Sequence, residues 1–150
     1  MGYWGLVDAI WDAVSIYDGP EAFLAQYARV PEPARTLFAA HWLQSEVRNG
    51  GLYQFFCNST GVLAPEAVEA FQKMGMPLTA AHLESAMGFF GTSYPRRGSD
   101  RERAIEEAED ARGEEWPGPF VAESVAIEEL LRTENGGFRA AADSYARKHS

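Results

Sequence analysis

Residues 46–61 read EVRNGGLYQFFCNSTG, and this segment sets the path of the chain. A strong helical pattern leads into it, and Gly50 predicts the end of that helix, because glycine adopts the left-handed conformation of a helix terminus at little cost. Leu52, Phe55 and Phe56 then recur at helical spacing, before an Asn-Ser-Thr-Gly sequence predicts a second stop. We therefore expect two sharp turns around a short aromatic helix.

The remainder of the chain is typical of an all-α protein. Apolar residues recur at the spacing of helices, Gly and Pro separate these segments, and strand-like alternation never persists beyond a few residues. We expect one all-α domain over residues 1–150, a compact bundle of about seven to nine helices. The expected helices cover residues 4–17, 21–29, 34–48, 52–58, 65–74, 77 or 78 to 89, 100–111, 120–134 and 138–148.

The apolar stripes of these helices predict which side chains are buried. Glu46 continues the stripe of Phe38 and Trp42, so its carboxylate is expected to face the interior. A second Asn-Gly-Gly at residues 135–137 indicates the same capping geometry as the first rather than a duplication, because the flanking residues differ. The stripes nearest the N-terminus are expected to bury Trp4, Val7, Ile10 or Trp11, Val14, Tyr17, Phe23, Leu24 and Tyr27.

Length and composition favour a globular protein in a reducing compartment. A chain of 150 residues with 46% hydrophobic residues can bury about two-thirds of its unfolded surface in one core. Its one cysteine, Cys57, excludes an intrachain disulfide. Asp8 and Asp12 interrupt the first apolar run, which argues against a signal peptide, and no uncharged run reaches the ~18 residues of a membrane span. We expect a soluble, cytoplasmic protein.

The negative charge of the chain is concentrated in one segment. The formal charge is −9, and residues 100–134 contain twelve acids and four bases, a net −8. No basic face is available to displace counterions from phosphates, so we expect no direct binding to nucleic acid.

Part of this segment predicts an acidic surface on a helix. Glu102, Glu106, Glu109 and Asp110 recur at steps of three and four residues, which places their carboxylates on one side of the helix. Such a row costs helix stability and could attract a basic partner, although acidic helices also serve solubility alone. The acidic face is expected to comprise Glu102, Glu106, Glu107, Glu109, Asp110, Glu114, Glu115, Glu128 and Glu129. Whether Arg96, Arg97, Arg101 and Arg103 neutralise it, for example through an Arg103–Glu107 pair, stays open from sequence.

No pattern in the chain indicates catalysis or a cofactor. Cys57 has no base linked to it by a motif, and no metal-ligand spacing or phosphate-binding glycine loop is present in the sequence. We expect a non-enzymatic protein without metal or cofactor. The alternative left open is a small-ligand or catalytic pocket formed by His41, Glu46, Asn49 and Gln54.

Residues 46–61 also resemble the sequence signature of a known protein family. The acid-x-x-Asn-Gly-Gly-aromatic-x-Gln-Phe-Phe-x-Asn-x-x-Gly pattern is similar to that of a bacterial family of unknown function typified by a neisserial DNA-mimic protein. Leu52 departs from it, standing where the family usually has Phe. The residues that match are Glu46, Asn49, Gly50, Gly51, Gln54, Phe55, Phe56, Asn58 and Gly61.

The resemblance implies an all-α domain and connects the chain with DNA mimicry. We expect these signature residues to be mainly structural. The carboxylate of Glu46 is expected to accept backbone N–H groups near the start of the short aromatic helix, and the amides of Asn49, Gln54 and Asn58 to tie the two turns together.

Three hypotheses of function follow. The first is an acidic binding protein that engages a basic DNA-binding protein, such as a transcription regulator, in competition with DNA. The second is an immunity- or antitoxin-like inhibitor of a basic toxin, and the third is the pocket described above. A homodimer also stays open, through an apolar patch formed by the tryptophans with Phe55 and Phe56.

Overall fold

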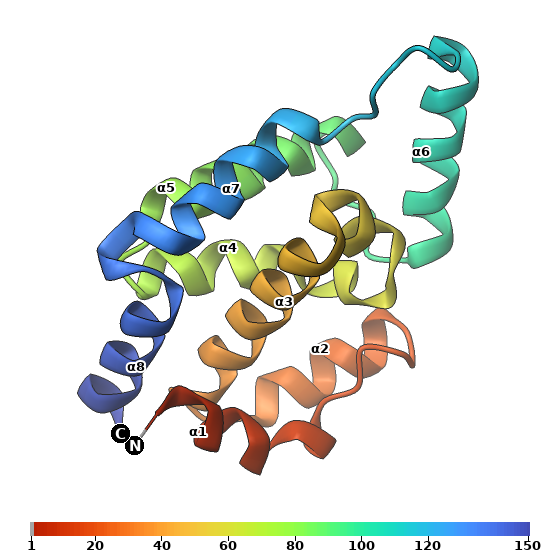
Figure 1. The fold of residues 1–150 in the computed structure, drawn as a ribbon. Helices are drawn as coiled ribbons and strands as arrows, with labels where there is room; N and C mark the ends of the chain where they lie inside the picture. The colour runs from red at the N-terminus through yellow and green to blue at the C-terminus, as the bar shows by residue number, and fades with distance from the viewer. Residues whose placement is uncertain (1) are drawn as a thin grey trace.

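Helix α3 (Ala34–Cys57) runs through the middle of the molecule, and the other helices pack around it (Figure 1). Its buried residues extend from Ala34 to Phe56 and are not confined to one stripe, which is typical of a helix surrounded by protein. Leu37, Leu43 and Phe55 are completely inaccessible to solvent. This central helix contains most of the stretch that the sequence singled out.

The computed structural model describes residues 2–150, which form eight α-helices and four short 3₁₀ segments. The predicted all-α bundle is therefore confirmed. The α-helices are α1 (Tyr3–Ala9), α2 (Pro20–Arg29), α3 (Ala34–Cys57), α4 (Ala64–Lys73), α5 (Pro77–Met87), α6 (Gly98–Arg112), α7 (Val121–Thr133) and α8 (Phe138–His149). The 3₁₀ segments are Trp11–Ala13, Ser59–Leu63, Gly88–Phe90 and Glu134–Gly136.

The helices lie on different sides of α3. Helices α4 and α7 pack against α3, and α5 packs against both α4 and α7, while α1 and α8 meet at the end of the molecule where both termini lie (Figure 1). The backbone N–H of Tyr3 donates to Asp143 Oδ1 at 2.8 Å, which joins α1 to α8. Within residues 2–150, no helix combines the length and the apolar character needed to cross a membrane.

Helix α6 stands at the side of the bundle (Figure 1). It contacts the C-terminal half of α3 and the 59–63 turn, and residues 113–120 connect it to α7. Only Arg101 and Ile105 of α6 are buried, so most of its surface faces solvent.

The predicted first helix over residues 4–17 is wrong beyond Ala9. The chain forms a 3₁₀ turn at Trp11–Ala13 and is extended at Val14, with φ −128° and ψ 120°. Val14 and Ile16 are both buried, so the apolar pattern here has the two-residue period of extended chain rather than the helical period. Tyr17, expected on the buried stripe, is 74% exposed.

Trp4 and Leu24 were likewise expected to be buried. They are 42% and 40% exposed, respectively. The remaining expected helices differ from the observed ones by a few residues at their ends, as helix boundaries generally do.

The break predicted within the central stretch is present, because α3 consists of two helical segments that meet at a kink. The non-helical residues are Gly50, at φ −153°, and Gly51, at φ 72° and ψ −175°. The prediction that Gly50 takes the left-handed conformation is wrong, since the positive φ falls on Gly51. Gly50 is required for a different reason, because a Cβ there would lie 2.1 Å from Gln54 Oε1.

The second Asn-Gly-Gly has a different geometry. Asn135, Gly136 and Gly137 all have positive φ, at 52°, 85° and 96°, and the Asn135 amide donates to the carbonyl of Met74 at 2.9 Å. The expectation of a shared capping geometry is therefore wrong, because the first motif has one residue of positive φ at a kink within α3, whereas the second has three, between α7 and α8.

Candidate functional site

The kink in α3 is held by a cluster of polar side chains. Glu46 Oε2 accepts hydrogen bonds from Gln54 Nε2 at 2.6 Å and from Asn58 Nδ2 at 3.2 Å. Asn49 Nδ2 donates to Gln54 Oε1 at 3.3 Å. The three amides thus tie the turns together, as predicted, and Glu46 is 9% exposed, as its inward stripe indicated.

The expectation that the Glu46 carboxylate accepts backbone N–H groups is wrong. Its carboxylate bonds to side-chain amides on the far side of the kink, whereas the backbone N–H of Leu52 donates to Ser124 Oγ of α7 at 2.9 Å. In a straight helix, Gln54 and Asn58 would lie about 12 and 18 Å along the axis from Glu46. The kink at Gly50 and Gly51 therefore brings their amides within reach of its carboxylate.

The hypothesis of a ligand site at Glu46 gains no support from this arrangement. Glu46 and Gln54 satisfy each other, and His41 lies in an aromatic cluster, with its Nδ1 3.0 Å from the Tyr3 hydroxyl and its ring 4.8 Å from Trp4. Burial lowers the pKa of His41, so this imidazole is neutral near pH 7.

Phe55 and Phe56 belong to the core. Neither side chain is exposed, and the Phe56 ring packs against Phe120 at 4.7 Å and edge-on to Phe90 at 5.2 Å. The expectation that they extend an apolar surface patch is therefore wrong. Their burial fixes the end of α3 against the 88–90 segment and the start of α7.

Helix α6 is fastened to this end of α3 by the side chain of Arg101. The guanidinium is completely buried and bonds only backbone carbonyls. Nε donates to Phe56 O at 2.8 Å and Nη2 to Asn58 O at 3.0 Å. Nη1 donates to Pro95 O at 3.1 Å and to Arg96 O at 2.6 Å. Burial lowers the pKa of Arg101, but a guanidinium remains protonated in proteins.

Gly61, the last residue of the signature, makes room for this guanidinium. A Cβ on Gly61 would lie 2.6 Å from Arg101 Nε, closer than a Cβ atom approaches a non-bonded neighbour. The Tyr94 hydroxyl donates to the Gly61 carbonyl at 2.6 Å, and Arg96 Nη1 donates to Val62 O at 3.0 Å. Residues 94–101 therefore wrap the turn that follows α3.

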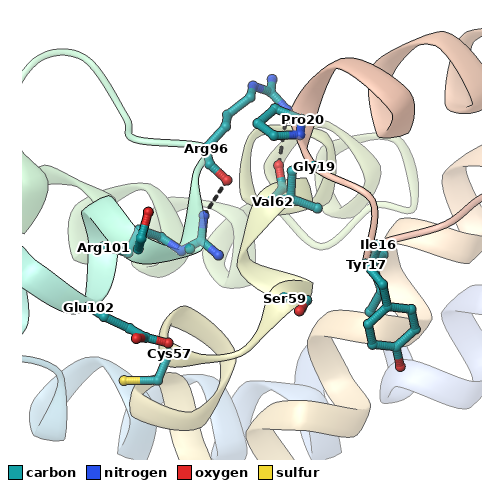
Figure 2. Close-up of a pocket in the computed structure, with 12 residues that line it drawn as sticks. Ile16, Tyr17, Gly19, Pro20, Cys57, Ser59, Val62, Arg96, Arg101 and Glu102 are labelled. Atoms are coloured by element: carbon teal, nitrogen blue, oxygen red, sulfur yellow. Dashed lines mark hydrogen bonds between the residues drawn. The ribbon is translucent and has the colours of Figure 1, made fainter.

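The wrapped turn borders a pocket of about 350 Å³ (Figure 2). Figure 2 shows Arg101 directed at the carbonyl of Arg96, and the Arg96 side chain reaching Val62. The guanidinium of Arg101 thus donates its hydrogen bonds to carbonyls of the protein itself. Burial raises the pKa of Cys57 on the pocket wall, which favours the thiol over the reactive thiolate.

With α6 held in this way, its acids face solvent. Glu102, Glu106, Glu107 and Asp110 are exposed. Glu109 is half-buried and accepts a hydrogen bond from the Tyr53 hydroxyl, at 3.3 Å to Oε2 and 3.4 Å to Oε1. We call these five residues the α6 acid row.

The nearby arginines do not neutralise the α6 acid row. Arg96 pairs with Glu66 at 2.8 Å and Arg97 with Glu21 at 2.6 Å. Arg103 lies 3.5 Å from Asp100, one turn back, so the expected Arg103–Glu107 pair is not formed. Within residues 2–150, no residue of the row is in an ion pair.

The other four residues of the predicted acidic face lie apart from the row. Glu114 and Glu115 are exposed in the connection after α6. Glu128 and Glu129 are on α7, and Glu129 pairs with Arg132 at 2.6 Å. The structure thus divides the predicted face into a row on α6 and separate acids on the loop and on α7.

A second pocket of about 310 Å³ lies between the kink of α3 and α7. One wall is formed by Gly50, Gly51 and Tyr53, and the facing wall by Val121 and Val125, with further lining from residues 117–120, Ser124 and Glu128. We call this the α3–α7 pocket.

The role of Arg101 differs from the one that its sequence position among the bases near the acids indicates. Its side chain attaches the acidic helix to the end of α3 and does not neutralise the acids. The available signal was its position, three and four residues before Ala104 and Ile105, which places it on the apolar stripe of α6.

Among the comparisons with known proteins, one identifies a family. No curated protein and no solved structure matches the chain. The sequence model described as DMP19-like protein matches residues 28–149, which include the kink of α3, the turn that follows it and all of α6. The chain therefore belongs to the family of DMP19-like proteins.

Proposed function

We propose that this protein is a non-enzymatic acidic binding protein whose α6 acid row engages a basic DNA-binding protein, such as a transcription regulator, in place of DNA. The observation that carries the proposal is the contrast between two sets of charges. The arginines near α6 are engaged elsewhere, and the carboxylates of the row form no ion pair, with four of the five exposed.

The attachment of α6 supports this reading. Arg101 fixes the helix through backbone carbonyls, so the attachment occupies none of the carboxylates of the α6 acid row. A row of carboxylates on a helix that is already ordered attracts a basic surface and loses little conformational freedom on binding.

Affinity capture tests the proposal. Immobilised wild-type protein is exposed to lysate of the source organism at ~50 mM salt and eluted at ~500 mM, because screening at high salt releases partners held by charge. The first variant neutralises four of the five carboxylates of the row, through E106Q, E107Q, E109Q and D110N.

The matched control removes four exposed acids elsewhere, through D8N, D12N, D18N and E84Q. We expect a basic DNA-binding protein to be retained by the wild type and the control but lost by the first variant. A toxin encoded beside this gene would favour the inhibitor hypothesis instead. Equal capture by the two variants would contradict an electrostatic role of the row.

A further inference from the structure

The α3–α7 pocket collects exposed apolar side chains. Tyr53, Val121 and Val125 are 45%, 49% and 64% exposed. They are three of the seven large hydrophobic residues that are exposed within residues 2–150, and all three line this one pocket. Apolar side chains gathered at a concave site favour a binding surface over incidental exposure.

The signature glycines open this pocket. Gly50 and Gly51 bring bare backbone to its wall, and the Ser124 hydroxyl beside them accepts the backbone N–H of Leu52. A Cβ on Gly51 would lie 3.2 Å from Ser124 Oγ and would require a strained backbone at φ 72°. The same kink that shapes the core thus leaves a recess between α3 and α7.

Acids lie on both sides of the recess. Glu128 lines the pocket from α7, and Glu109 of the α6 acid row accepts the hydroxyl of Tyr53, which forms the opposite wall. Neither carboxylate is in an ion pair within residues 2–150. The nearby cations are engaged elsewhere, since Arg112 lies over the Trp116 ring at 5.1 Å and Arg132 pairs with Glu129.

We propose that the α3–α7 pocket receives an apolar side chain of the basic partner, carried between Lys or Arg residues that face Glu109 and Glu128. The charge complementarity of the rim selects such a segment over a neutral one, and the apolar walls provide affinity that salt does not screen. This inference rests on the proposed function and adds to it an anchoring contact beside the acid row.

Two synthetic Lys- and Arg-rich helical peptides of equal charge test the anchor. One carries two leucines a helical turn apart, and the other carries alanines at those positions. By fluorescence anisotropy we expect the wild type to bind the leucine peptide about tenfold more tightly, at both ~50 and ~200 mM salt. On addition of the leucine peptide, the amide resonances of Gly51 and Val125 should shift more than those of Leu24 and Leu78.

Two variants test whether the preference for the leucine peptide depends on the α3–α7 pocket. V121S/V125S should bind the two peptides equally, with unchanged affinity for the alanine peptide. The control L24S/L78S removes apolar side chains of 40% and 57% exposure elsewhere and should keep the tenfold preference. Because all four side chains are exposed, circular dichroism should show unchanged helicity for both variants.

The outcomes separate the two proposals. Equal binding of both peptides by the wild type would overturn the anchor and leave the acidic row in place, whereas no binding of either peptide at ~50 mM salt would overturn the proposed function itself. If V121S/V125S abolished self-association in sedimentation without changing the peptide preference, the pocket would be a contact between copies of this chain, and the anchor would be wrong.

Discussion

At the scale of single residues, the fold near the α6 acid row depends on the buried Arg101 side chain and on Gly61, which leaves room for it. The guanidinium presents donors in a planar fork, and the carbonyls of Phe56, Asn58, Pro95 and Arg96 converge on it. A lysine has a single charged nitrogen and does not reproduce this geometry. The arginine therefore connects the turn after α3, the 94–97 segment and α6 through one side chain.

Replacing Arg101 should unfold this junction. In R101M, carbonyls that now accept from Arg101 would be left in a buried position without donors, so we expect the free energy of unfolding to fall by about 3–5 kcal/mol. Urea denaturation followed by circular dichroism measures it. R103M is the matched control, because Arg103 is exposed and only weakly paired, and it should stay within about 0.5 kcal/mol of wild type. Equal effects of R101M and R103M would contradict the role of Arg101.

Gly61 should be intolerant of even one methyl group. The Cβ of G61A would meet Arg101 Nε at 2.6 Å, so we expect a loss of about 1–3 kcal/mol from displacement of the guanidinium. G88A is the control, since Gly88 has helical φ and no atom lies within 4 Å of its added Cβ. It should be neutral or stabilising by up to about 1 kcal/mol. The strain explanation fails if G61A is as stable as G88A.

At the scale of elements, one carboxylate joins three helices. Glu32 accepts from the Thr36 backbone N–H at 3.0 Å and its hydroxyl at 2.7 Å in α3, from Lys73 of α4 at 3.1 Å, and from the Tyr145 hydroxyl of α8 at 3.4 Å. Burial opposes ionisation of Glu32, but the bonds from Thr36 and Lys73 outweigh it, so the pKa of Glu32 is lowered below its usual value.

This lowered pKa predicts how stability depends on pH. A carboxyl that binds its proton more weakly in the folded state contributes its full stabilisation above the unfolded pKa of about 4.3 and loses it as the pH falls through the folded value. We expect E32Q to be less stable than wild type near pH 7, with the difference in Tm shrinking between about pH 5 and pH 3. A difference that stayed constant over this range would contradict the assignment to Glu32.

At the scale of the whole molecule, the sequence predicted the helical bundle better than the contacts that join its helices. Helical spacing identified the bundle, and the Asn-Gly-Gly at residue 49 marked the bend in α3. The sequence does not say which glycine takes the positive φ, because either one can adopt it. In the structure it is Gly51, beside Ser124 of α7, which is distant in sequence. The extended chain at Val14 was missed because a short apolar run fits helical and two-residue periods alike.

The sequence predicted the candidate site only in part, because contacts between distant residues determine the rest. The acidic helix could be identified from composition, because charge density is visible in sequence. Whether its carboxylates were free depended on where Arg96, Arg97 and Arg101 pointed, and their partners Glu66, Glu21 and the backbone of residues 56–58 come from distant positions. The α3–α7 pocket likewise arises from the approach of two helices about seventy residues apart in sequence.

Competition with DNA shows whether the α6 acid row occupies the DNA-binding surface of the basic partner. The basic protein retained by this chain is bound to a fluorescent duplex carrying its site, and displacement of the duplex is measured by anisotropy at ~50 mM salt. We predict that the E106Q/E107Q/E109Q/D110N variant needs about ten- to a hundredfold more protein for half displacement than wild type. The D8N/D12N/D18N/E84Q control, of the same total charge, should stay within about twofold of wild type. Equal losses in the two variants would show that net charge alone is responsible, and no loss in either would show that the α6 acid row does not stand in for DNA.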